Sequence, residues 1–275
     1  MATHARTAYE SGKEQVNVIP RIALSAACTL LLAACSIPRK PEIPMESRFY
    51  QAGKTQSEDL VVFLPGRGDT PTAFEKAGFL EILAASSRPM DAVVVDAHLG
   101  YYISGLLAER VYQDVLMHYR NRGYRDFYLV GTSLGGYGAL WVDHEHQALI
   151  SGLILIAPYL GDDSVVKQVD EAGGIARWRT ELDHEPSKDE FPWVWLDNVR
   201  AAGHGSIESV ILGFGVKDKF RPAAEIAAKA IPAPFVFRVD GAHNWKTWTE
   251  AWRTILGSPA WSSFFGPGQP GDGDD

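Results

Sequence analysis

The most restrictive feature of this sequence is a glycine-rich hexapeptide, GTSLGG at residues 131–136, which separates an apolar run from a helical pattern. The run 127–130 is typical of a buried strand, and residues 134–148 have helical periodicity. Glycines on both sides of Ser133 permit a tight, strained turn and close packing of the helix on the strand. Such a turn holds the Ser133 hydroxyl at a helix N-terminus, where backbone N–H groups stabilise negative charge. The hexapeptide therefore predicts a strand, a turn with an accessible serine, and a helix; the alternative is a turn whose serine caps the helix or binds phosphate.

The rest of the chain alternates short apolar runs with helical patterns. Helical spacing of apolar residues occurs in 105–119, 134–148, 222–230 and 245–255. The strand candidates are 60–64, 92–95, 127–130, 153–156, 210–214 and 234–239. Strands that are apolar on both faces and separated by helices are typical of a parallel sheet with helices on both sides. The expected fold class is α/β, with a doubly wound, mostly parallel sheet in a single domain that covers 55–262.

Three segments interrupt or flank this alternation. Residues 161–206 are rich in charge and tryptophan, and extra segments that follow strand ends lie over the ligand crevice of open sheets. We therefore expect a small helical lid there, whose aromatic residues either line an acyl pocket or pack on the core. Residues 35–54 include three prolines and are expected to form an extended tether. Residues 263–275, mostly Gly, Pro and Asp, are expected to be a disordered tail.

One histidine and one aspartate follow strand candidates as Ser133 does. His243 stands after 234–239, in the run GAHNW, and Asp218 stands after 210–214. Because the carboxyl ends of neighbouring parallel strands meet at one edge of a sheet, both side chains can face Ser133. A serine needs a base to take its proton, and an imidazole base needs a carboxylate to fix its tautomer. Ser133, His243 and Asp218 are therefore the candidate nucleophile, base and orienting carboxylate.

Other acidic residues and histidines are weaker candidates. Asp163 or Asp162, after 153–156, remains the alternative to Asp218, whereas Asp96 is interpreted as structural. His144 and His146 are two positions apart on a helix and point in different directions, so they do not form a metal pair. The sequence predicts no metal site.

The order Ser133, Asp218, His243 and the hexapeptide resemble the α/β-hydrolase family over roughly residues 55–260. The run GAHNWKTW is similar to the histidine turn of the esterase branch that includes esterase D and the mycolyltransferases. The resemblance implies an oxyanion hole formed by two backbone N–H groups, those of Leu134 and of Arg67 or Gly68. The usual histidine before the glycine of this loop is replaced by Pro65 here.

This resemblance implies a serine hydrolase that cleaves ester or thioester bonds through an acyl-enzyme, with no cofactor. Three alternatives stay open: an acyltransferase that uses the same three residues, a peptidase, for which no peptide-binding extension occurs in the sequence, and a non-catalytic surface lipoprotein with the same fold. The expected substrate is a small-molecule or lipid ester. The net charge of −8 and the lack of a long basic run make nucleic acid an unsuitable partner.

The N-terminal region has the pattern of an export signal. Residues 22–34 form an apolar stretch that follows Arg21 and is too short to span a bilayer. The run LAAC that ends at Cys35 resembles the lipobox of bacterial lipoproteins, in which the cysteine is acylated and becomes the new N-terminus; Cys28 closes a poorer match. We therefore expect a signal peptide at 1–34, a lipid on Cys35, and export to the periplasmic face or the cell surface, where the lipid anchors the protein to the membrane.

Overall fold

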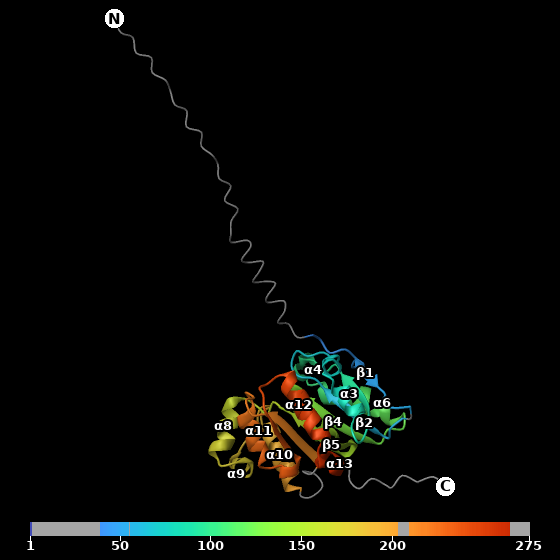
Figure 1. Cartoon of the computed structure of the whole chain (residues 1–275). Helices are drawn as coiled ribbons and strands as arrows, with labels where there is room; N and C mark the ends of the chain where they lie inside the picture. Colours follow the sequence, from blue (N-terminus) through green and yellow to red (C-terminus); the bar gives the residue numbers. More distant parts are fainter. Residues whose placement is uncertain (2–38, 55, 203–208, 265–275) are drawn as a thin grey trace. The chain divides into compact units, whose positions relative to one another are not determined.

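A mostly parallel sheet forms the centre of the unit Arg39–Asp275 in the computed structural model, which describes residues 1, 39–54, 56–202 and 209–264. Within these residues the sheet has seven strands in the order β1-β3-β2-β4-β5-β6-β7 (Figure 1). The strands are β1 (Ser47–Tyr50), β2 (Asp59–Leu64), β3 (Asp91–Val95), β4 (Asp126–Thr132), β5 (Ile150–Ile156), β6 (Val210–Gly215) and β7 (Val236–Val239). All neighbouring pairs are parallel except β1 with β3. The predicted α/β class with a doubly wound, mostly parallel sheet is confirmed.

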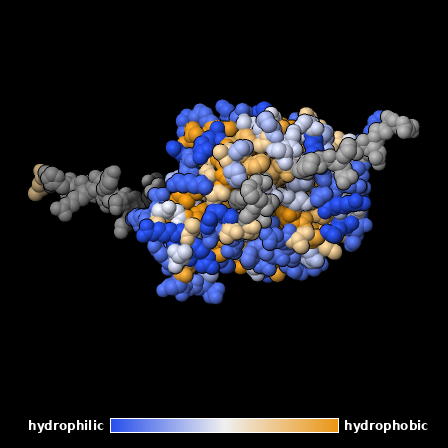
Figure 2. All heavy atoms as spheres, turned by 90° about the horizontal axis from the view of Figure 1, so that it is seen from below, coloured by the Kyte–Doolittle hydropathy of each residue, from blue (hydrophilic) through white to orange (hydrophobic). Residues whose placement is uncertain are grey.

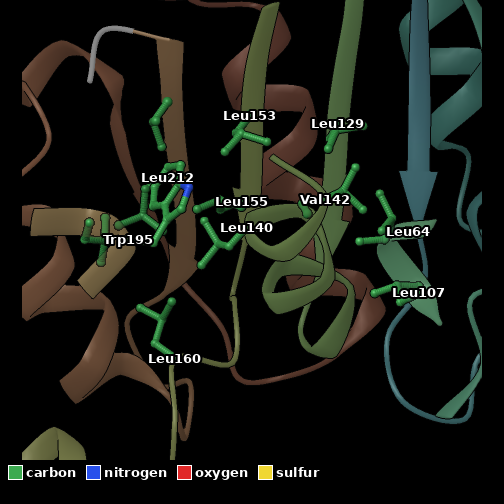
Figure 3. Close-up of a cluster of buried hydrophobic side chains, with 14 of the residues drawn as sticks. Leu64, Leu107, Leu129, Leu140, Val142, Leu153, Leu155, Leu160, Trp195 and Leu212 are labelled. Atoms are coloured by element: carbon green, nitrogen blue, oxygen red, sulfur yellow. The ribbon is translucent and has the colours of Figure 1, made fainter. Parts of the chain in front are cut away.

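Helices cover both faces of this sheet. Along β2, Leu60, Val62 and Leu64 belong to one buried cluster, whereas Val61 and Phe63 belong to the other. This alternation follows from the two-residue period of a strand, and it makes both faces apolar. Figure 3 shows part of the first cluster, in which Leu64, Leu129 and Leu153 from the strands gather around Leu140 and Val142 of the following helix.

The first face carries α4 (Leu99–Ser104), α5 (Leu107–Arg110), a π-helical turn (Val111–Leu116), α6 (Met117–Arg120), α7 (Leu134–His146) and α11 (Arg221–Ala228). The second face carries α2 (Ala73–Lys76), α3 (Phe79–Ala84), α12 (Trp245–Leu256) and α13 (Pro259–Phe264). Figure 1 shows α3 and α12 side by side, and the Phe79 and Trp252 rings stack at 5.5 Å between centroids. On the outer surface seen in Figure 2, hydrophilic and hydrophobic residues are interspersed.

The expected limits of the domain need two corrections. Residues 47–50, assigned to the tether, form β1, which pairs with β3 from Ser47 opposite Val95 to Tyr50 opposite Ala92. Upstream, the Met45 N–H donates to Asp114 at 2.7 Å, and Arg39 forms an ion pair with Asp96. The domain therefore begins well before residue 55; β1 lacks the apolar pattern of the other strands because it lies at the sheet edge, half-exposed.

At the other end, α13 continues to Phe264, two residues beyond the expected limit of 262. The Phe264 ring packs on Tyr128 of β4, at 5.9 Å between centroids. The remainder of the expected tail, 265–275, lies outside the described residues.

The insertion after β5 folds into α8 (Asp163–Glu171), α9 (Ile175–Glu181) and α10 (Phe191–Ala201). Its tryptophans Trp178, Trp193 and Trp195 belong to the buried cluster of the first sheet face. The Trp195 indole N–H donates to Asp143 of α7 at 2.9 Å, which fastens α10 to α7. Of the two roles expected for these aromatic residues, the structure supports packing on the core.

Candidate active site

The turn between β4 and α7 gives Ser133 an unusual backbone conformation, with φ 52° and ψ −116°. A positive φ is unfavourable for a residue with a side chain and costs about 1–3 kcal/mol. The turn is held by hydrogen bonds from the Ser133 N–H to the Ile156 carbonyl at 3.0 Å and from the Tyr159 N–H to the Ser133 carbonyl at 2.9 Å. A Cβ atom on Gly135 would collide with the Leu64 carbonyl oxygen, so only glycine permits this approach of α7 to β2.

His243 connects Ser133 to Asp218. Its Nε2 lies 2.9 Å from the Ser133 Oγ, and its Nδ1 lies 2.9 Å from both carboxylate oxygens of Asp218. The Asp218 carboxylate has no exposed area and also accepts a hydrogen bond from the Phe220 N–H at 2.8 Å. Because the carboxylate can only accept, Nδ1 carries the proton and Nε2 is free to accept the serine proton.

The sheet topology explains why residues so far apart in sequence meet. Ser133 lies at the end of β4, and Asp218 and His243 follow β6 and β7. Because these strands run in the same direction, their carboxyl ends meet at one edge of the sheet. Two backbone hydrogen bonds fasten the loops after β6 and β7 to each other: Val216 N–H to the Val239 carbonyl and Lys217 N–H to the Gly241 carbonyl, each 2.9 Å.

The alternative acidic residues lie in other environments. Asp162 caps α8, since its carboxylate accepts from the N–H groups of Ser164 and Val165 at 3.0 Å, and Asp163 begins that helix. Asp96 pairs with Arg39. Of the carboxylates considered from the sequence, Asp218 is the one next to His243.

A cavity of about 670 Å³ opens beside Ser133 and His243. Its lining residues are Arg67, Asp69, Leu99, Ser133, Leu134, Tyr159, Lys219, Phe220, His243, Asn244, Trp245 and Trp248. Within the described residues, none of the lining comes from the expected lid. The insertion instead supports the wall from outside, because the Tyr159 hydroxyl donates to Asp189 at 2.5 Å. The expectation that 161–206 form a lid therefore stays a prediction, and the residues that line this cavity do not favour it. Residues 203–206 of the segment lie outside the described residues.

Two of the lining groups have perturbed acidities. Burial raises the pKa of Asp69, and the Trp245 indole N–H, which donates to its Oδ1 at 3.1 Å, acts in the opposite direction. Burial also raises the pKa of Tyr159, and the neighbouring Asp189 carboxylate adds to the rise, so this phenol is neutral at physiological pH. Neither residue could be singled out from the sequence as part of the site; for Asp69, the available signal was Trp245, two residues after His243 in the run GAHNW.

The two expected oxyanion donors stand at the cavity wall. Leu134 is the first residue of α7, and its N–H has no partner four residues earlier in the helix. The loop that holds Arg67 reaches the serine, since a Cβ on Gly66 would lie 3.5 Å from the Ser133 Cβ. No group of three or more His, Cys, Asp or Glu side chains suited to a metal ion occurs in the part of the chain that the structure describes.

Comparison with known proteins identifies the fold. No protein-family model matches the chain, and no curated protein matches it significantly. Several solved structures, in contrast, align with most of the chain. A ferulic acid esterase aligns over 84% of this chain and 97% of its own, with 15% identity and a TM-score of 0.56. Est1E from Butyrivibrio proteoclasticus aligns over 80% and 98%, with 14% identity and a TM-score of 0.52.

The S-formylglutathione hydrolase FrmB from Staphylococcus aureus aligns over 80% of this chain and 97% of its own, with 15% identity and a TM-score of 0.51. The chain therefore has the α/β-hydrolase fold. At this level of identity, the likeness establishes the fold and not the activity.

Proposed function

We propose that the protein is a serine hydrolase that cleaves carboxylic ester or thioester bonds. The observation that carries this proposal is the chain of hydrogen bonds from Ser133 through His243 to Asp218 beside a cavity that can admit a substrate. The names of the structural neighbours, an esterase and a thioester hydrolase, agree with it.

In this mechanism the Ser133 oxygen attacks the carbonyl carbon while His243 Nε2 takes the hydroxyl proton. The buried Asp218 carboxylate stabilises the imidazolium that forms. The N–H groups of Leu134 and Arg67 donate to the oxyanion of the tetrahedral intermediate. His243 then protonates the leaving alcohol or thiol, and the acyl group stays on Ser133.

The second half of the reaction repeats these steps with water. His243 takes a proton from a water molecule, the hydroxide attacks the acyl carbon, and the serine oxygen leaves as its proton is returned. Apart from the substrate and this water molecule, the proposed steps use only side chains and backbone groups of the chain.

A panel of p-nitrophenyl esters from acetate to palmitate tests the proposal on the full-length protein in detergent. We expect hydrolysis by the wild type and a loss of about 10³-fold or more in kcat/KM in Ser133→Ala, because the nucleophile is lost. The preferred chain length reports the size of the acyl site. A wild type that is inactive on every ester and whose Ser133 does not react with a fluorophosphonate would contradict the proposal; labelling without hydrolysis would favour acyl transfer.

We further propose that the protein is exported and anchored to the bacterial membrane through a lipid on Cys35. Cys35 and the signal segment lie outside the described residues, so the lipobox-like sequence is the support. Within the described ranges, no helix is both long and apolar enough to cross a bilayer. We expect Cys35→Ser to move the protein from the membrane pellet to the supernatant, measured by fractionation; a variant that still pellets contradicts the lipid anchor.

A further inference from the structure

We propose that the substrate carries a negatively charged group on its alcohol or thiol part, and that Lys219, assisted by Arg67, binds it at the mouth of the cavity. This inference rests on the proposed hydrolase function and narrows its substrate class.

Two basic side chains in the cavity wall, Arg67 and Lys219, have no acidic partner in the part of the chain that the structure describes. Arg67 belongs to the loop after β2 and Lys219 to the loop after β6, and β4, which leads to Ser133, lies between these strands. Neither forms an ion pair within the described residues, although the chain has eight more acidic than basic residues. Unpaired cations on both sides of the nucleophile make this cavity attractive to an anion.

The basic residues on either side of Lys219 in sequence, unlike Lys219, lie close to acidic side chains. Lys217 pairs with Asp240 at 2.7 Å, and Arg221 lies 3.6 Å from Glu225. Lys219, between them in sequence, lines the cavity, with its Nζ 4.7 Å from the centroid of the Phe220 ring. Of these three cations, Lys219 is therefore the one available to a ligand in the cavity.

The acidic residue of the wall, Asp69, forms its hydrogen bonds elsewhere and is not an ion-pair partner of these cations in the described structure. The Asp69 carboxylate accepts from the Trp245 indole N–H, and its other oxygen lies 2.8 Å from the position of a Cβ on Gly66, so the carboxylate is turned into its own loop. Neither Arg67 nor Lys219 forms an ion pair with it within the described residues. The lining therefore holds two cations and one carboxylate, and the two cations are left without an ion-pair partner in the described structure.

The position of Lys219 indicates which part of the substrate is charged. Phe220 packs on His243 with 4.8 Å between ring centroids, and Lys219 lies over the same Phe220 ring. In the proposed reaction His243 protonates the leaving group, so that group lies on the His243 side. An anion bound by Lys219 therefore belongs to the alcohol or thiol part rather than to the acyl part.

The test compares 4-acetoxybenzoate, whose leaving phenol carries a carboxylate, with its neutral methyl ester. The readout is the ratio of the two kcat/KM values, and the change of this ratio between variants cancels the intrinsic reactivities of the esters. We expect Lys219→Met to lower the ratio about 10-fold and Lys219→Glu to lower it further, since a cation is lost and then replaced by a like charge. Added salt should lower the wild-type ratio more than that of Lys219→Met, in which Arg67 alone remains to be screened.

Lys217→Met is the matched control, because it removes a nearby lysine whose partner is Asp240. We expect it to change the ratio less than twofold, roughly the effect of an exposed charge outside the cavity. A wild type that hydrolyses both esters with a ratio unaffected by Lys219→Met overturns the inference and leaves the proposed hydrolase intact. If neither ester is hydrolysed, slowing of fluorophosphonate labelling by 4-hydroxybenzoate, relieved in Lys219→Met, supports the anion site, and equal slowing in both proteins overturns it. A wild type that neither hydrolyses nor is labelled contradicts the hydrolase proposal itself.

Discussion

Two buried carboxylates of this protein each accept a hydrogen bond from the ring N–H of an aromatic side chain, and they differ in what that ring can do. Asp218 lies 2.9 Å from the His243 imidazole, and Asp143 lies 2.9 Å from the Trp195 indole. An imidazole has a second nitrogen that can accept a proton, whereas an indole only donates. The first pair can therefore pass a proton to and from Ser133, while the second pair can only join α10 to α7.

The surroundings of the two carboxylates fit these roles. Asp218 receives a second hydrogen bond, from the Phe220 N–H, and its imidazole partner lies at a cavity. Burial raises the pKa of Asp143 to about 6, and the Trp195 N–H and the nearby His144 act in the opposite direction. A buried carboxylate is thus not by itself a sign of catalysis. Whether it can take part in proton transfer depends on the side chain that it orients.

The largest expected difference between the pairs is in activity. Asp218→Asn should lower kcat/KM for p-nitrophenyl acetate by about 10³-fold or more, because an amide neither fixes the imidazole tautomer nor stabilises the imidazolium. Asp143→Asn, the matched control, should stay within about twofold of the wild type, as expected for a group that does not touch the substrate. Comparable losses of kcat/KM in both variants would contradict the different roles assigned here to the two carboxylates.

The next effect is the dependence of stability on pH. Asp143 has a folded pKa of about 6, above its ordinary value of 3.8, so the folded state holds more protons than the unfolded state between these values. Stability contributed by this group is therefore present at low pH and is lost as pH rises from about 4 to about 6, by at most about 3 kcal/mol. Urea unfolding at pH 4, 5, 6 and 7 should show a shallower loss over this range in Asp143→Asn than in the wild type. Parallel curves would mean that Asp143 titrates at its ordinary value.

The smallest effect concerns the hydrogen bond that fastens the insertion. Trp195→Phe should reduce the free energy of unfolding by about 2 kcal/mol, since it removes apolar contact and leaves the Asp143 carboxylate without its donor. Activity on short esters should remain within a factor of about two, because the insertion does not line the cavity in the described structure. A large loss of activity at unchanged stability would restore the interpretation of this segment as a lid.

The parts that could be predicted from the sequence are those with a local pattern. Strands β2 to β7 are mostly apolar runs, and the turn at Ser133 has glycines at fixed positions, so both are visible in the residues themselves. The proximity of Asp218 and His243 followed from one further rule, that the carboxyl ends of parallel strands share an edge.

The remainder depends on contacts that no local pattern encodes. β1 could not be predicted because an edge strand needs no apolar alternation, and its sequence SRFY is half polar. The aromatic residues of the insertion look the same in sequence whether they face a ligand or a core, and only their burial in the cluster of the first sheet face and the contact of Trp195 with Asp143 distinguish the two. The cations Arg67 and Lys219 stand among many surface charges in sequence, and only the cavity sets them apart.

The backbone of Ser133 has a consequence for how such a protein can evolve. Its φ of 52° suits glycine, so Ser133→Gly should relieve strain and could make the fold more stable while removing the hydroxyl. Mutations that only improve stability therefore lead away from the proposed nucleophile at this position. A serine at this position therefore lowers the stability of the fold, and the backbone hydrogen bonds of Ser133 with Ile156 and Tyr159 hold the turn in spite of that cost.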